Sequence, residues 1–202
     1  MKHPRNYIWN DPVWLVGLLV VLILASTSGG YFAKQVSSWV MYDLLGRNPA
    51  QEMAPNVIAG QADRLAIPSL GLNAPLVYIE QKDEPTFQKA LENGVVHYPG
   101  TALPGELGNA YYFGHSSDYV FKPGSYKTVF ATLPKMKVGD EVYITDSVGK
   151  QFVYAVVETK VVEPDDISVL SQGEAKEKKL TLQASYPLGT ALKRYLVVAR
   201  LK

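Results

Sequence analysis

Three side chains that could together transfer an acyl group stand on three separate segments of the chain. His115 follows the apolar run "AYYFG", Ser185 ends the run "LTLQAS", and Arg194 belongs to the basic pair before "YLVVARL". A hydroxyl can attack a carbonyl, an imidazole can accept its proton, and a guanidinium can stabilise the resulting oxyanion. Taken singly, each residue is better explained as structural, because spacing alone does not bring the three together.

The composition excludes several classes of protein. The 202 residues carry a net charge of +1 and contain no cysteine, so disulfides, thiolate metal sites and a thiol nucleophile are excluded. No basic patch is interleaved with aromatic residues, so we expect no nucleic-acid partner. No metal-binding or phosphate-binding motif occurs, and we expect no cofactor. A calcium site at Asp165, Asp166 and the carboxylates of 174–177 remains open as an alternative.

The N-terminal region has the features of a membrane anchor. No charged side chain occurs between Asp11 and Lys34. This stretch is long enough to cross a bilayer as a helix, so we predict a single transmembrane helix over 12–33. Lys2 and Arg5 precede it and favour a cytoplasmic N-terminus. A cleaved signal peptide is the alternative, because small residues follow the apolar run.

The rest of the chain would then lie outside the cytoplasm. We predict a cytoplasmic tail over 1–11, a juxtamembrane helix and linker over 34–62, and a folded extracellular domain over 63–202. Short segments rich in Val, Ile, Tyr and Thr dominate that domain, and Gly and Pro separate them. This pattern predicts an all-β barrel or sandwich. Two short helices are expected, in "DEPTFQKALENG" and in "YKTVFATLP".

Four blocks of the folded domain resemble the sortase family of membrane-anchored cysteine transpeptidases. They are "LAIPSLGLNAPLV", "GVVHYPGTALPGELGNAYYFGHSS", "VFATLPKMKVGDEVYI" and "LTLQASYPLGTALKRYLV", and they occur in the family's order. The resemblance covers Arg64 to Leu201. It places the family's catalytic His on His115 and its catalytic Arg on Arg194.

This resemblance implies a fold, an activity and partners. The fold would be a closed barrel of about eight strands with short helices, anchored in the cell membrane. The enzyme would cleave a C-terminal sorting signal of a surface protein through an acyl-enzyme. An amine on a cell-wall precursor or on another surface protein would then accept the acyl group.

The chain departs from the family pattern at the nucleophile. The family motif ends in Thr-Cys, whereas this chain has Ala184 and Ser185. A thiol ionises near pH 8.5 and can be held as a thiolate, but a serine hydroxyl must lose its proton as it attacks. His115 would therefore have to be neutral and act as general base. Asp118, in the same segment, is a candidate to orient that His.

Three interpretations follow from Ser185. The chain is an active transpeptidase or peptidase that uses Ser185, a catalytically silent relative that binds sorting-signal peptides or a surface partner, or a variant whose Cys was replaced by design. Ala184 argues against the third, since a designed inactivation needs only one change. Because His115 and Arg194 both match the family pattern, we favour the first.

Overall fold

The computed structural model describes residues 61–118, 123–173 and 176–202. Its strands are β1 (Arg64–Ile67), β2 (Leu72–Val77), β3 (Val95–His97), β4 (Gly108–Phe113), β5 (Glu141–Thr145), β6 (Gln151–Val162), β7 (Lys178–Tyr186) and β8 (Lys193–Leu201). Its helical segments are α5 (Glu84–Leu91) and the single-turn 3₁₀ helices η2 (Pro68–Leu70), η3 (Leu133–Lys135) and η4 (Ile167–Leu170).

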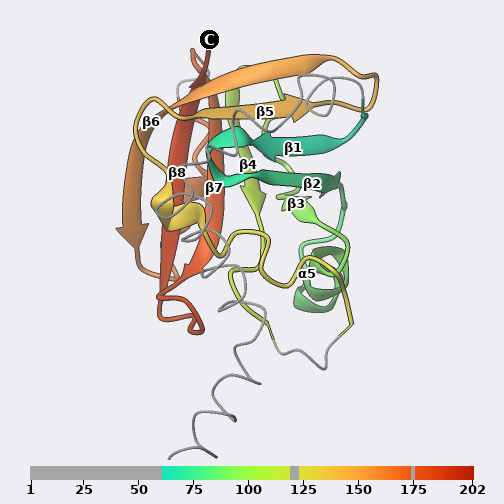
Figure 1. Ribbon diagram of the computed structural model, residues 1–202, viewed down its shortest axis with the longest axis vertical. Coiled ribbons are helices and arrows are strands. Elements are labelled where there is room, and N and C mark those ends of the chain that lie inside the picture. The colour runs from blue at the N-terminus through green and yellow to red at the C-terminus, as the bar shows by residue number, and fades with distance from the viewer. Residues whose placement is uncertain (1–60, 119–122, 174–175) are drawn as a thin grey trace, which may run out of the picture.

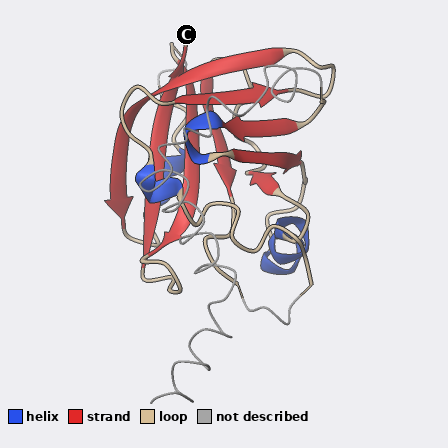
Figure 2. Cartoon of the chain, in the orientation of Figure 1, coloured by secondary structure: helices blue, strands red, loops and turns tan. Residues whose placement is uncertain are grey.

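Eight strands close into a barrel in the order β1-β2-β3-β4-β7-β8-β6-β5, with β5 pairing back onto β1 (Figure 1). The expectation of a closed barrel is confirmed. Two of the pairings are parallel, β2 with β3 and β4 with β7, and the others are antiparallel. A parallel pair needs a crossover connection rather than a tight turn. The crossover from β2 to β3 contains α5, which lies beside β3 (Figures 1 and 2).

The first predicted helix is α5, and its sequence explains its start. The Asp83 carboxylate accepts a hydrogen bond from the Thr86 backbone N–H at 3.0 Å, which satisfies one of the donors left open at a helix N-terminus. Pro85 stands in the first turn, where no N–H is needed. The buried face includes Ala90 and Leu91, which lie in the apolar cluster beneath the helix.

The second predicted helix, "YKTVFATLP", is only partly correct. This segment forms consecutive turns and ends in η3, in which the Lys135 N–H bonds the Thr132 carbonyl and the Met136 N–H bonds the Leu133 carbonyl. These bonds span three residues, as in a 3₁₀ helix, rather than four. Pro134, with no N–H, cannot extend an α-helical ladder here.

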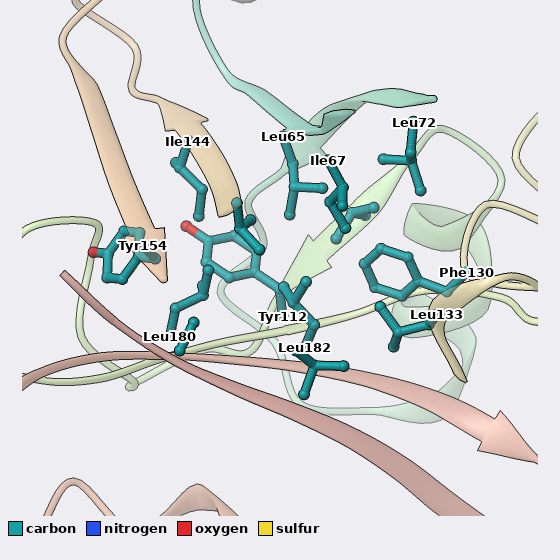
Figure 3. Close-up of a cluster of buried hydrophobic side chains, with 14 of the residues drawn as sticks. Leu65, Ile67, Leu72, Tyr112, Phe130, Leu133, Ile144, Tyr154, Leu180 and Leu182 are labelled. Carbon is teal, nitrogen blue, oxygen red and sulfur yellow. The ribbon is translucent and has the colours of Figure 1, made fainter. Parts of the chain in front are cut away.

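The barrel interior is apolar and centres on Tyr112, which is fully buried (Figure 3). The Tyr112 hydroxyl lies 3.2 Å from that of Tyr78. His97 contacts both tyrosine rings, and its Nε2 lies 3.0 Å from the Ala102 carbonyl oxygen. His97 is therefore part of the packed interior, and its polar atom is bonded to backbone.

Alternation along β7 determines which side chains leave the core. Leu182 and Ala184 point into the interior cluster. Because successive side chains of a strand point to opposite faces, Gln183 and Ser185 point outward. The outer face of β7, between its neighbours β4 and β8, is where the candidate chemistry lies.

The predicted tail, transmembrane helix and most of the linker, 1–60, lie outside the described residues. Within the part of the chain that is described, no helix combines the length and the apolar character that a membrane span requires.

Candidate active site

A pocket of about 370 Å³ opens on the outer face of the barrel wall and brings the three predicted residues together. His115, Ser185 and Arg194 all line it. The other lining residues come from α5, β3–β4, and the segment between β6 and β7. They are Glu84, Phe87, Gln88, Leu91, Tyr98, Tyr111, Phe113, Gly114, Pro164, Asp166, Ile167, Val169, Leu170 and Gln183.

Strand register places Ser185 next to Arg194. The two are directly paired across the antiparallel β7–β8 ladder, so their side chains share one face. Arg194 Nη1 donates to the carbonyl oxygens of Ala191 and Lys193, at 2.9 and 3.1 Å. Its Nε and Nη2 donate to no residue in the described ranges, so these donors are available to an oxyanion or a carbonyl in the pocket.

His115 is delivered to the pocket by the end of β4. The Gly114 N–H donates to the Gln183 carbonyl at 3.1 Å, and the Phe130 N–H donates to the His115 carbonyl at 2.9 Å. Farther along the same segment, the Ser117 hydroxyl accepts from the Gly189 N–H at 3.1 Å. The segment that carries the His is thus bonded both to the strand that carries Ser185 and to the turn that follows it.

The contacts of the three side chains bear on how they could react. The Asp118 carboxylate lies 3.7 Å from His115 Nε2, within ion-pair range but beyond hydrogen-bond range. Ser185 Oγ makes no hydrogen bond to any residue in the described ranges, His115 included. A serine mechanism needs that contact, although catalytic hydrogen bonds are often long before substrate binds.

One wall of the pocket is aromatic. The Phe87 ring, on α5, stands edge-on to Phe113 with centroids 5.2 Å apart, and it also contacts Tyr98 at 5.8 Å. Such a wall offers apolar surface to a ligand side chain. Arg194 is the only Lys or Arg that lines the described pocket, whereas Glu84 and Asp166 are acidic. The polarity suits a peptide with apolar side chains better than an anionic ligand.

A second wall is the segment between β6 and β7, and two side-chain amides bind it to the barrel. Asn109 Nδ2 donates to the Val169 carbonyl at 3.1 Å, while its Oδ1 accepts from the Thr181 hydroxyl at 2.8 Å. Gln172 Oε1 accepts from the backbone N–H groups of Ala102 and Asn109. These bonds fix η4, which carries several of the lining residues of this wall.

Tyr111 and Gln183 are polar residues of the pocket that were not predicted as site residues. The Tyr111 hydroxyl donates to Gln183 Oε1 at 2.5 Å, and both side chains line the pocket. Burial raises the pKa of Tyr111, which Arg194 opposes only in part, so the phenol keeps its proton. The alternation in "LTLQAS" could have placed Gln183 on the face of Ser185. Tyr111 could not have been found that way, because its position depends on the β4–β7 pairing.

The calcium alternative concerned Asp165, Asp166 and 174–177, of which 174–175 lie outside the described residues. Asp166 accepts from the Ser168 N–H at 3.0 Å and caps η4. Among the residues with described positions, no group of three or more His, Asp or Glu side chains is arranged to hold a metal ion.

Comparison with known proteins relates this chain to one family. The model of the sortase domain matches residues 65–202. Sortase D of Bacillus subtilis (strain 168) is 33% identical over 145 residues, which is 70% of this chain. The match spans 64% of that relative's length.

Similar solved structures are also sortases. The Clostridium perfringens sortase D5 transpeptidase is 29% identical with a TM-score of 0.56, covering 69% of this chain and 77% of the other. Sortase C-1 of Actinomyces oris is 28% identical with a TM-score of 0.58, covering 69% and 72%.

Proposed function

Because the chain belongs to the sortase family, we propose that its barrel is a transpeptidase domain that uses Ser185 as its nucleophile. One observation carries the proposal: His115, Ser185 and Arg194 come from three distant segments and line a single pocket. Chance placement of three such groups in one pocket is a poorer explanation than a common role. The aromatic wall and the size of the pocket suit a peptide substrate.

In the proposed reaction, Ser185 is the nucleophile, His115 transfers the proton and Arg194 binds the oxyanion. Ser185 Oγ attacks the carbonyl carbon of the scissile peptide bond while His115 accepts the hydroxyl proton. The unbonded donors of Arg194 stabilise the oxyanion. The tetrahedral intermediate collapses, His115 gives its proton to the leaving amine, and an ester to Ser185 remains. An incoming amine attacks this ester, His115 takes the amine's proton, and Ser185 recovers it.

The substrate would be the sorting signal of a surface protein, and the acceptor an amine on a cell-wall precursor or on another surface protein. The clostridial relative is described as a transpeptidase, and that description supports acyl transfer over hydrolysis alone. A location at the cell membrane, with the domain outside the cytoplasm, belongs to the same proposal. The predicted anchor over 12–33 supports it.

A second candidate function is a silent domain that binds sorting-signal peptides or a surface partner. The observation in its favour is that Ser185 Oγ has no hydrogen bond to His115, so no base contacts the hydroxyl in the structure without substrate. Both candidates use the same pocket. They differ in whether Ser185 becomes acylated.

The test uses the full chain in detergent micelles, a library of LPxTG-like peptides and an added amine, with masses read for peptides and protein. An acyl adduct on Ser185 in wild type, absent in Ser185→Ala and His115→Ala, would support the transpeptidase. Turnover in Ser185→Cys alone would favour the silent peptide-binding domain. If neither wild type nor Ser185→Cys forms an adduct or turns over a peptide, acyl transfer at this site is refuted.

A further inference from the structure

Gln183 has a side-chain geometry that points to a role in binding substrate. Its Oε1 accepts the Tyr111 hydroxyl, so the amide oxygen is directed toward β4. No residue in the described ranges accepts a hydrogen bond from its Nε2. Two N–H donors are therefore presented, half-buried, in the pocket that also contains Ser185. A donor left unpaired in such a place lowers the stability of the folded protein, and a ligand that provides an acceptor removes that cost.

The partner Tyr111 makes this orientation a fixed one. Its ring is 2% exposed and contacts Tyr98 edge-on at 6.1 Å, so it is packed on the barrel wall and has little freedom to turn. Because burial keeps the phenol protonated, its hydroxyl remains a donor and requires an acceptor. The only acceptor that it meets among the described residues is the Gln183 oxygen.

The position of Gln183 on β7 indicates which part of a peptide it would meet. Gln183 precedes Ser185 by two residues on the same strand face, a spacing of about 6.6 Å. An extended peptide covers the same distance in two residues. A peptide whose scissile carbonyl lies at Ser185 therefore has a second backbone carbonyl beside Gln183.

The pocket also indicates the acyl side of the peptide. On β4, Tyr111 pairs with Thr181 and Phe113 pairs with Gln183. Both partners precede Ser185 on β7. None of residues 187–192, which follow Ser185 in the turn, lines the pocket. The enclosed side is suited to the part of the substrate that stays attached in the ester. The open side leaves a path for the departing and incoming amines.

We propose that Gln183, held through its oxygen by the Tyr111 hydroxyl, donates from Nε2 to a backbone carbonyl of the acyl-side peptide, two residues before the scissile residue. Gln183 is then a positioning residue, since it aligns the carbonyl that Ser185 attacks without touching the reacting atoms. The inference rests on the proposed function in that the ligand is a peptide, but it does not require that Ser185 reacts.

The test is a coupling measurement on full-length Ser185→Ala in micelles, which cannot form an ester. The probe is the tightest-binding LPxTG-like library peptide, fluorescently labelled, together with a series in which each backbone carbonyl in turn is replaced by methylene. Dissociation constants are measured for Gln183 and for Gln183→Leu. We expect one carbonyl replacement to weaken binding about 5- to 10-fold with Gln183 and to have no effect with Gln183→Leu.

Three further variants make the result specific. Gln88 lines the same pocket, where its Nε2 donates to Glu84, so Gln88→Leu is the matched control and should leave the carbonyl effect intact. Gln183→Glu should bind more weakly than Gln183→Leu, because a carboxylate repels the carbonyl. Tyr111→Phe should reduce the carbonyl effect to about 2- to 3-fold, because the amide is no longer oriented.

The outcomes separate this inference from the proposed function. Coupling to one carbonyl supports the role of Gln183 even if neither wild type nor Ser185→Cys turns over a peptide. Turnover without such coupling overturns the role of Gln183 alone. Equal carbonyl effects in Gln183→Leu and Gln88→Leu, or no peptide binding at all, also overturn it.

Discussion

Gln172 fixes the pocket wall between β6 and β7, so its replacement should lower both stability and peptide affinity. Its Oε1 accepts from the backbone N–H groups of Ala102 at 3.1 Å and Asn109 at 3.0 Å, and its Nε2 donates to the Leu170 carbonyl at 2.9 Å. Gly108 makes room for this oxygen, because a Cβ there would lie 2.8 Å from it. The change Gln172→Leu preserves volume and removes all three bonds.

The expected loss follows from the N–H groups left without an acceptor. Asn109 is 4% exposed, so its N–H cannot turn to water, and an unsatisfied buried donor costs about 1–3 kcal/mol. Ala102 is half-buried and adds about 1 kcal/mol. A total of about 3 kcal/mol should lower the melting temperature of a domain of this size by about 10 °C.

The measurement is thermal unfolding of the full chain in micelles by near-UV circular dichroism, with peptide affinity determined alongside. Gln172→Glu retains an acceptor for both N–H groups and should lose less than half as much. Gln81→Leu makes the same chemical change at an exposed residue without a hydrogen bond in the described ranges, and should be neutral. A shift below about 3 °C in Gln172→Leu, or one equal to that of Gln81→Leu, would refute the reasoning.

Two further predictions concern His97 and Gly114. Burial lowers the pKa of His97 below 6.5. As the pH falls, the unfolded chain therefore binds this proton before the folded chain does. The free energy of unfolding should be constant above about pH 6.5 and should decrease as the pH falls toward the pKa of His97 in the folded chain. Denaturant unfolding across pH, compared with His97→Gln, checks this, and parallel curves would contradict it. In Gly114→Ala the new Cβ would lie 2.8 Å from the Phe130 ring and 2.9 Å from Val129, so overpacking should cost about 1–3 kcal/mol. Because the Phe130 N–H bonds the His115 carbonyl, any turnover should fall as well, and unchanged melting and turnover would oppose this.

Much of the barrel could be predicted because its strands are long enough to show a pattern. In β5, Val142 and Ile144 are fully buried and Tyr143 between them is not, as alternation predicts. Thr145, expected on the same face as Tyr143, is nevertheless buried. A strand such as β3 is hard to predict, because its three residues are all buried and show no alternation. The helix expected in "YKTVFATLP" was only partly correct, because apolar spacing alone does not separate an α-helix from successive 3₁₀ turns.

The site was less accessible to sequence reasoning. Nothing in the spacing of His115, Ser185 and Arg194 brings them together, and the prediction depended on resemblance to a family. The structure supplies the physical reason: β4 pairs in parallel with β7, and Ser185 pairs with Arg194 across β7 and β8. The Tyr111–Gln183 bond depends on the same long-range pairing, which local sequence does not encode.

The strand order also has a consequence for the order of folding. β8 is last in sequence yet lies between β7 and β6, so each of them remains an exposed edge until β8 is inserted. β7 and β8 are adjacent in sequence, whereas β4 and β7 pair across a long stretch of chain, and pairings of this long-range kind form slowly. The wall that carries His115, Ser185 and Arg194 is therefore complete only when both the β4–β7 pairing and the β7–β8 pairing have formed.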